Sequence, residues 1–122
     1  MSATIKPAIR EDVLPDTRYI DAPLREFLDG IAPVRDRLRR LTLFGSRARG
    51  DQRHDSDYDV LVVVDRRSAE LLDFLYERVM DVLLAHGRVV SLKVLEEKDW
   101  VRLQALHTPF MQHVEEEGRS LG

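Results

Sequence analysis

The feature that most constrains the fold is the stretch Leu41–Asp65, in which two apolar runs flank a polar loop. The first run, Leu41–Phe44, is too short for a helix and stops at Gly45, so it predicts a buried strand. The second run, Val60–Val64, consists almost entirely of β-branched residues, which favour the extended backbone of a strand. The stretch therefore predicts two strands of the core with a polar loop between them.

Two acidic residues stand at the start of the second strand. Asp57 and Asp59 are two positions apart, and because strand side chains alternate, both carboxylates are expected on one face and Tyr58 on the other. Carboxylates that converge on one point repel each other and raise each other's pKa unless a cation binds between them. Magnesium takes oxygen ligands and is commonly held by one or two carboxylates together with substrate phosphates. The pair therefore predicts a Mg²⁺ site.

A phosphate site is expected opposite this acid pair. Gly45 allows a sharp backbone turn, and Ser46 can cap a short helix that runs through Ala48. The free N–H groups and the positive dipole end of such a helix attract anions. A phosphate cradle that faces a metal-binding acid pair suits phosphoryl or nucleotidyl transfer.

The same residues carry a resemblance to a known family. Gly45-Ser46, followed by ten residues and then Asp57-Tyr58-Asp59, resembles the signature of the polymerase-β-like nucleotidyltransferase superfamily. The flanking sequences Leu-Phe-Gly-Ser-Arg-Ala-Arg-Gly and Ser-Asp-Tyr-Asp-Val-Leu-Val-Val resemble its small stand-alone branch, the minimal nucleotidyltransferases. The resemblance implies the nucleotidyltransferase fold.

The resemblance also implies a role for each motif residue. These roles are metal binding by Asp57 and Asp59, phosphate binding by Gly45 and Ser46, and stabilisation of the developing charge by Arg47 or Arg49. The alternative for the two arginines is a structural ion pair with Asp51 or Asp55.

Two classes of function follow from the resemblance. The first is an enzyme that binds a nucleoside triphosphate, with ATP favoured, together with Mg²⁺ and transfers a nucleoside monophosphate to an acceptor hydroxyl. The second is a catalytically weakened nucleotide- or protein-binding module that acts as an antitoxin or regulatory subunit. Small relatives of this kind are often the antitoxins of a HEPN-type ribonuclease toxin, which they modify with AMP or bind. Because the chain has little room for an acceptor-recognition domain, a HEPN-type protein partner or a homodimer is expected in both cases.

The third strand departs from the family pattern. Active relatives usually carry a third metal-binding carboxylate on this strand, and the matching position within Arg88–Leu95 is Ser91. A serine hydroxyl is a far poorer Mg²⁺ ligand than a carboxylate, and Lys93 adds a positive charge on the same face. The two-ion site is therefore expected to be incomplete, with the nucleotide-bound ion retained better than the ion that activates the nucleophile. The alternative is that Glu96 or Glu97 reaches in from the end of the strand.

Composition narrows the function classes. The chain has 19 basic and 22 acidic residues, and its net charge of −3 argues against a broad nucleic-acid-binding surface. A local basic patch remains open, because seven arginines cluster in sequence around the site: Arg35, Arg37, Arg39, Arg40, Arg47, Arg49 and Arg53. The alternative is that the first four lie on the solvent face of a helix. There is no cysteine, which excludes thiol chemistry. No apolar run reaches membrane-spanning length and no signal peptide is visible, so a cytoplasmic location is expected.

The rest of the chain predicts four helical segments around the strands. The first begins with Asp21 as its N-cap and is either kinked or divided by a proline. The second runs from Ser68 to Gly87, which caps its C-terminus. The last two cover residues 96–106 and 108–118.

These elements predict one domain over residues 1–122, in which residues 1–20 form a partly ordered arm or a short strand, and the resemblance implies that it is a nucleotidyltransferase domain. The expected fold class is α/β (α+β), with a small mixed β-sheet and helices packed mainly on one face.

Overall fold

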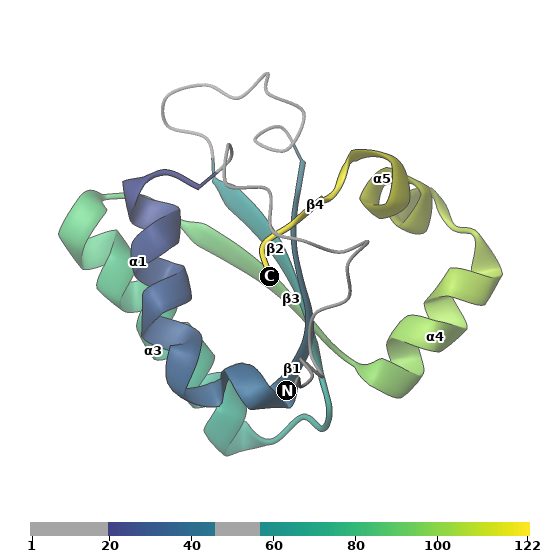
Figure 1. The fold of residues 1–122 in the computed structure, drawn as a ribbon, viewed down its shortest axis with the longest axis horizontal. Helices are drawn as coiled ribbons and strands as arrows, with labels where there is room; N and C mark the ends of the chain where they lie inside the picture. Colours follow the sequence, from purple (N-terminus) through teal and green to yellow (C-terminus); the bar gives the residue numbers. More distant parts are fainter. Residues whose placement is uncertain (1–19, 46–56) are drawn as a thin grey trace, which may run out of the picture.

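The three strands expected from the sequence form the greater part of a four-stranded sheet. The computed structural model describes residues 20–45 and 57–122, and Figure 1 shows their arrangement. In chain order the elements are α1 (Ala22–Ile31), the 3₁₀ segment η3 (Ala32–Arg37), β1 (Leu38–Phe44), β2 (Tyr58–Val64), α3 (Ala69–His86), β3 (Val90–Glu96), α4 (Glu97–Leu106), α5 (Pro109–Glu117) and β4 (Arg119–Ser120). Residues 1–19 of the predicted arm, and residues 46–56, which hold the predicted phosphate loop after Gly45, lie outside the described residues.

The sheet is mixed, with the strand order β3-β2-β1-β4. β1 pairs with β2 and with β4 in antiparallel fashion, whereas β2 and β3 run parallel. A parallel pair needs a crossover connection, and α3 supplies it between β2 and β3. The α/β fold class with a small mixed sheet is therefore confirmed.

The helix ends follow the capping residues of the sequence. The Asp21 carboxylate accepts a hydrogen bond from the N–H of Leu24 at 3.3 Å and caps α1. The Ser68 hydroxyl accepts one from the N–H of Leu71 at 3.1 Å and caps α3, which ends at Gly87 in a left-handed conformation. The break expected in the first helix lies where α1 ends and the chain continues as η3, which is wound more tightly as a 3₁₀ helix. Within the part of the chain that the structure describes, no helix is both long and apolar enough to cross a bilayer.

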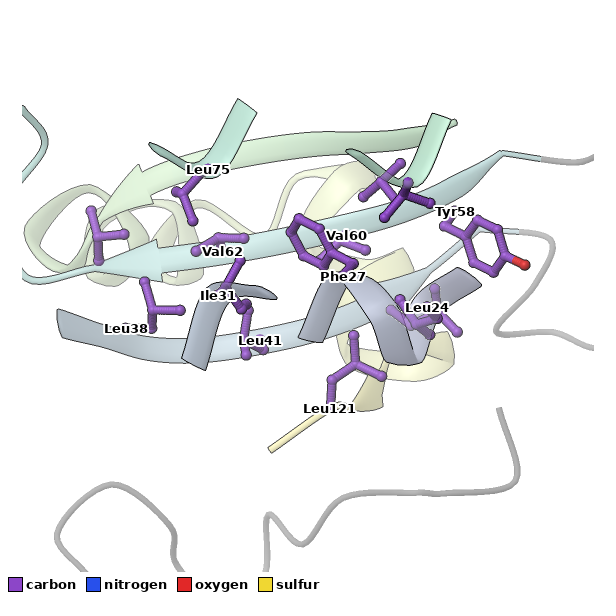
Figure 2. Packing of buried hydrophobic residues seen from close by; sticks show 14 of the residues in the cluster. Leu24, Phe27, Ile31, Leu38, Leu41, Tyr58, Val60, Val62, Leu75 and Leu121 are labelled. Atoms are coloured by element: carbon purple, nitrogen blue, oxygen red, sulfur yellow. The ribbon is translucent and has the colours of Figure 1, made fainter. Parts of the chain in front are cut away.

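The larger hydrophobic core lies between the sheet and the helices α1 and α3. Val60, Val62 and Val64 of β2 point to this side because alternate residues of a strand share a face. Phe27 of α1 and Leu75 of α3 are fully buried among the side chains of this core, and Figure 2 shows both beside β2. Burying a side chain of this size stabilises the fold by about 1.5–3 kcal/mol.

A smaller core covers the other face of the sheet. Leu61 and Val63 alternate with the valines of the larger core and pack with Trp100 of α4 and with Met111 and Val114 of α5. Figure 1 shows α1 and α3 on one side of the sheet and α4 and α5 on the other. The expectation that the helices pack mainly on one face is therefore wrong. Helices cover both faces, because Leu61 and Val63 must also be buried by apolar side chains.

The strand β4 is not predicted by the sequence analysis. Its two residues pair with Thr42 and Leu43 of β1. Leu121 follows it, is buried in the larger core, and donates its N–H to the carbonyl of Leu41 at 2.9 Å. So short a segment shows no periodicity of its own, and its pairing depends on the strand that it meets.

Candidate active site

The ends of three strands meet at one point of the sheet. The register pairs Phe44 of β1 with Asp59 of β2, and Asp59 with Ser91 of β3. Gly45 directly follows Phe44. Asp59 alternates with Leu61 along β2, so its side chain lies on the sheet face of the smaller core. The structure thus brings Gly45, Asp59 and Ser91 together, three residues that the sequence analysis assigned to one site.

Gly45 and Asp59 are in direct contact. The backbone of Gly45 has a φ of +78°, a left-handed conformation that favours glycine. A Cβ atom at this position would lie 2.4 Å from Oδ2 of Asp59 and 3.3 Å from its Cγ. Glycine is therefore required here for two reasons, the turn of the chain and the carboxylate that packs against it.

The residue between the two acids joins β2 to the core. Tyr58 is buried, and its hydroxyl donates a hydrogen bond to Oδ2 of Asp21 at 2.7 Å; Figure 2 shows Tyr58 at one end of the packed side chains. Asp57, one residue before β2, is exposed, and Asp59 is half-buried. Tyr58 therefore enters the core while the two acids flank it outside the core, as the predicted alternation requires.

The bond between Tyr58 and Asp21 is a contact that the sequence analysis missed. Because Asp21 also caps α1, this bond connects the start of that helix to the strand that carries Asp59. A signal for it exists in the sequence, since a tyrosine predicted to enter a core needs a partner for its hydroxyl. The sequence does not show which residue supplies that partner.

β3 contributes no acid to this point. Ser91 is exposed beside Asp59, and Lys93, two residues further along the same face, is exposed beside Leu61. Within residues 20–45 and 57–122, no three histidine, aspartate or glutamate side chains form a group that could hold a metal ion. Among these residues the acid pair Asp57 and Asp59 therefore lacks a third carboxylate.

Glu96 and Glu97 do not fill the third position. Glu96 pairs with Val64, which lies about 16 Å along the strand from Asp59 at roughly 3.3 Å per residue. The N–H of Arg67 donates to Oε2 of Glu96 at 2.8 Å, and this bond lowers the pKa of the Glu96 carboxyl. Glu97 begins α4, beyond the same end of the sheet. The alternative that one of these acids reaches the site is therefore wrong.

The four arginines between positions 35 and 40 have partners inside the fold. Arg35 and Arg37 lie on the 3₁₀ helix η3, whereas Arg39 and Arg40 lie on β1, so the placement of all four on one helix is wrong. The contacts are Arg35 with the carbonyls of Leu38 at 2.7 Å and of Gly122, Arg37 with Asp65 at 3.6 Å, Arg39 with Glu97 at 3.6 Å, and Arg40 with the ring of Trp100 at 5.0 Å. Burial lowers the pKa of the Arg35 guanidinium. These four side chains have contacts within the fold, and the basic patch with Arg47, Arg49 and Arg53, which lie outside the described residues, stays a prediction.

Three predicted site residues lie outside the described residues, namely Ser46, Arg47 and Arg49, and so does the short helix through Ala48. Their phosphate-binding roles stay predictions. The binding of Mg²⁺ by Asp57 and Asp59 also stays a prediction.

The class of protein follows from the fold, the motif and a family comparison. Residues 28–121 match the family model described as polymerase beta, nucleotidyltransferase. The matched range contains all four strands together with Gly45, Asp57 and Asp59. The chain therefore belongs to this nucleotidyltransferase family, and the resemblance stated from the motif is confirmed.

The chain is also similar to one curated protein and to solved structures. The chain is 32% identical over 99 residues to a Methanocaldococcus jannaschii protein named as a putative protein adenylyltransferase, with 80% of this chain and 93% of that protein covered. The crystal structure of a toxin–antitoxin with AMP-PNP matches with a TM-score of 0.50 and 21% identity over 80% of this chain and 71% of that chain, and this likeness shows the fold. A structure named as a putative nucleotidyltransferase from Sulfolobus solfataricus has a TM-score of 0.48 and 25% identity over 66% of this chain and 69% of that chain.

Proposed function

We propose that this protein binds ATP together with Mg²⁺ and transfers AMP to a hydroxyl group of a partner protein. The observation that carries the proposal is the contact of the Asp59 carboxylate with Gly45, where two neighbouring strands end. This contact joins the two halves of the family motif, which are far enough apart in sequence that only the fold brings them together. The adenylyl group and the protein acceptor are proposed from the M. jannaschii relative.

The residues at this point fit one Mg²⁺ ion. Asp57 is exposed and Asp59 half-buried at the start of β2, and carboxylates are the ligands that Mg²⁺ takes together with substrate phosphates and water. Gly45 leaves the space that Oδ2 of Asp59 occupies. When bound, the ion would neutralise charge on the phosphates and polarise them for displacement. Asp57 and Asp59 would hold it.

The other motif residues have proposed roles in binding and orienting the triphosphate. Ser46 would bind phosphate oxygens, and Arg47 or Arg49 would form charge-assisted hydrogen bonds to them. In the transfer, the acceptor oxygen forms a bond to the α-phosphorus while the bond to the pyrophosphate oxygen breaks. Pyrophosphate leaves, and the hydroxyl proton passes to solvent.

A second candidate function is favoured by Ser91. The neutral, exposed Ser91 beside Asp59 supplies no carboxylate where a second ion would need one. A site of this kind retains nucleotide binding better than turnover, which suits an antitoxin or regulatory subunit that binds a HEPN-type partner. In either case the acceptor is proposed to come from a protein partner or from a second copy of the chain. The cytoplasmic location expected from the sequence stays a prediction.

Removing both site carboxylates tests the proposal. Isothermal titration of the protein with a non-hydrolysable ATP analogue is expected to show binding that requires Mg²⁺. The double variant Asp57→Asn/Asp59→Asn should weaken this binding by about 100-fold or more, because each charged contact is worth roughly 1.5–3 kcal/mol. A matched control is Asp29→Asn/Asp73→Asn, which changes the charge equally at exposed positions of α1 and α3 and should bind like the wild type.

Two outcomes would contradict the proposal. One is binding by the wild type that does not depend on Mg²⁺, and the other is equal affinity in the two double variants. If binding behaves as expected, labelled ATP separates the two candidate functions. Transfer of label to a co-purifying protein supports the enzyme, whereas tight binding without transfer supports the regulatory subunit.

A further inference from the structure

The strand β3 places two polar side chains on the face that carries Asp59. Along β3, Val90 is buried and Leu92 and Val94 pack against the larger core, so Ser91 and Lys93 point to the opposite face. Ser91 is in register with Asp59, and Lys93 lies two residues, about 7 Å, further along the strand. The Lys93 ammonium is thus within reach of the space beside the Asp59 carboxylate on its flexible four-carbon stem.

Lys93 is not used by the fold. It is exposed, and among the described residues it forms neither an ion pair nor a hydrogen bond. The other lysine in the described ranges, Lys98, lies at the far end of the sheet and pairs with Glu96 at 3.5 Å. Within the described ranges, then, Lys93 has no partner, and its positive charge stands on the face of Asp59, two residues further along the sheet.

Charge balance indicates what this lysine would bind. The carboxylates of Asp57 and Asp59 together cancel the charge of one divalent ion, so the charge of a bound triphosphate is left to cationic side chains, of which Arg47 or Arg49 is already proposed as one. Ser91 adds no charge, and a second ion would lack a carboxylate to hold it. A lysine ammonium is a compact point charge that binds phosphate oxygens well.

We propose, on the basis of the proposed function, that Lys93 binds the phosphates of the nucleoside triphosphate and that the site holds a single divalent ion. Lys93 supplies the positive charge on the side of Asp59 where Ser91 stands in place of an acid. The competing role is that of an edge-strand lysine, which discourages pairing with another chain, because β3 is an edge of the sheet. That role predicts no effect on nucleotide affinity.

Replacing Lys93 by methionine distinguishes these roles. Lys93→Met should bind the ATP analogue with Mg²⁺ about tenfold more weakly, since one charge-assisted contact is lost. The same variant should bind Mn²⁺ alone more tightly, because a positive charge near the carboxylates has been removed. Lys93→Arg should keep most of the affinity for the ATP analogue, and Lys98→Met, with the same change of charge far from the site, should leave both affinities unchanged.

The readouts are isothermal titration with the analogue and paramagnetic resonance of Mn²⁺, with circular dichroism to confirm folding. Equal affinity for the analogue in Lys93→Met and wild type would overturn the inference while leaving the proposed function intact. If the wild type itself fails to bind the analogue with Mg²⁺, the proposed function fails and this inference with it.

Introducing a carboxylate at position 91 tests whether the site holds only one divalent ion. Ser91 is exposed, so Ser91→Asp can be accommodated without disturbing the core. With the ATP analogue present, this variant should bind a second Mn²⁺ ion, whereas the wild type and Ser91→Asn should bind one each. Binding of two ions by the wild type would contradict the inference.

Discussion

Replacing Gly45 by alanine is expected to lower the Mg²⁺-dependent affinity for ATP by about tenfold or more, because the displaced Asp59 carboxylate loses a charged contact worth roughly 1.5–3 kcal/mol. The new Cβ atom would stand 2.4 Å from Oδ2 of Asp59, where an ordinary contact begins at 3.4 Å. The carboxylate must therefore move or rotate, and its place beside the turn is lost. Isothermal titration with the non-hydrolysable ATP analogue measures the effect.

Gly87→Ala is the matched control for this substitution. Gly87 also has a left-handed backbone, with a φ of +67°, but a Cβ atom there would meet nothing within 4 Å. Both variants should lose about 1–2 kcal/mol of folding free energy from the left-handed conformation, and only Gly45→Ala should lose nucleotide affinity. If the two variants bind the analogue equally well, the contact of Gly45 with Asp59 does not position the site.

The largest effect on stability is expected from Leu75→Ala, at about 2–5 kcal/mol. Leu75 of α3 is fully buried in the larger core, and its removal leaves a cavity beside β2 (Figure 2). Leu84 lies on the same helix with 77% of its surface exposed, so Leu84→Ala should change the free energy by less than about 0.5 kcal/mol. Urea unfolding followed by circular dichroism gives both values.

Comparing Leu75→Ala with Leu84→Ala excludes helix propensity as the cause of a difference in stability, because the same substitution is made twice in one helix. A similar loss in both variants would mean that the exposed face of α3 is buried in solution, for instance by a second chain. A small loss in both would mean that the larger core does not close over Leu75.

Much of the fold is predictable from local patterns in the sequence. The β-branched run Val60–Val64 is the centre of β2, and the caps Asp21 and Ser68 start α1 and α3 as expected. These features are local, since a strand's alternation and a capping hydrogen bond involve residues a few positions apart. The missed element, β4, has no such pattern. Its two residues form a strand only because β1 offers an open edge.

In the candidate site, too, some features are predictable from local sequence and others depend on how the strands pair. The expected common orientation of Asp57 and Asp59 follows from the period of a strand, and the assignment of Ser91 to the third position follows from the family resemblance. The contact of Gly45 with Asp59 depends on the antiparallel register of β1 and β2, and the place of Ser91 on the parallel register of β2 and β3. Registers between strands are set by packing across the whole sheet, which no short stretch of sequence contains.

Phe44, Asp59 and Ser91 lie in one row across three adjacent strands, and this row has a consequence for folding. A nucleotide bound at Gly45 and Asp59 touches elements that are correctly placed only when β1, β2 and β3 are paired in register. A shift of one residue would carry Tyr58 to the site and Asp59 into the apolar core. If the proposed nucleotide binds there, ligand binding and strand pairing would form a single equilibrium, and ligand at 100 times its dissociation constant would stabilise the native state by about 2.7 kcal/mol. The cellular nucleotide concentration would then help to set the fraction of chains that are correctly folded.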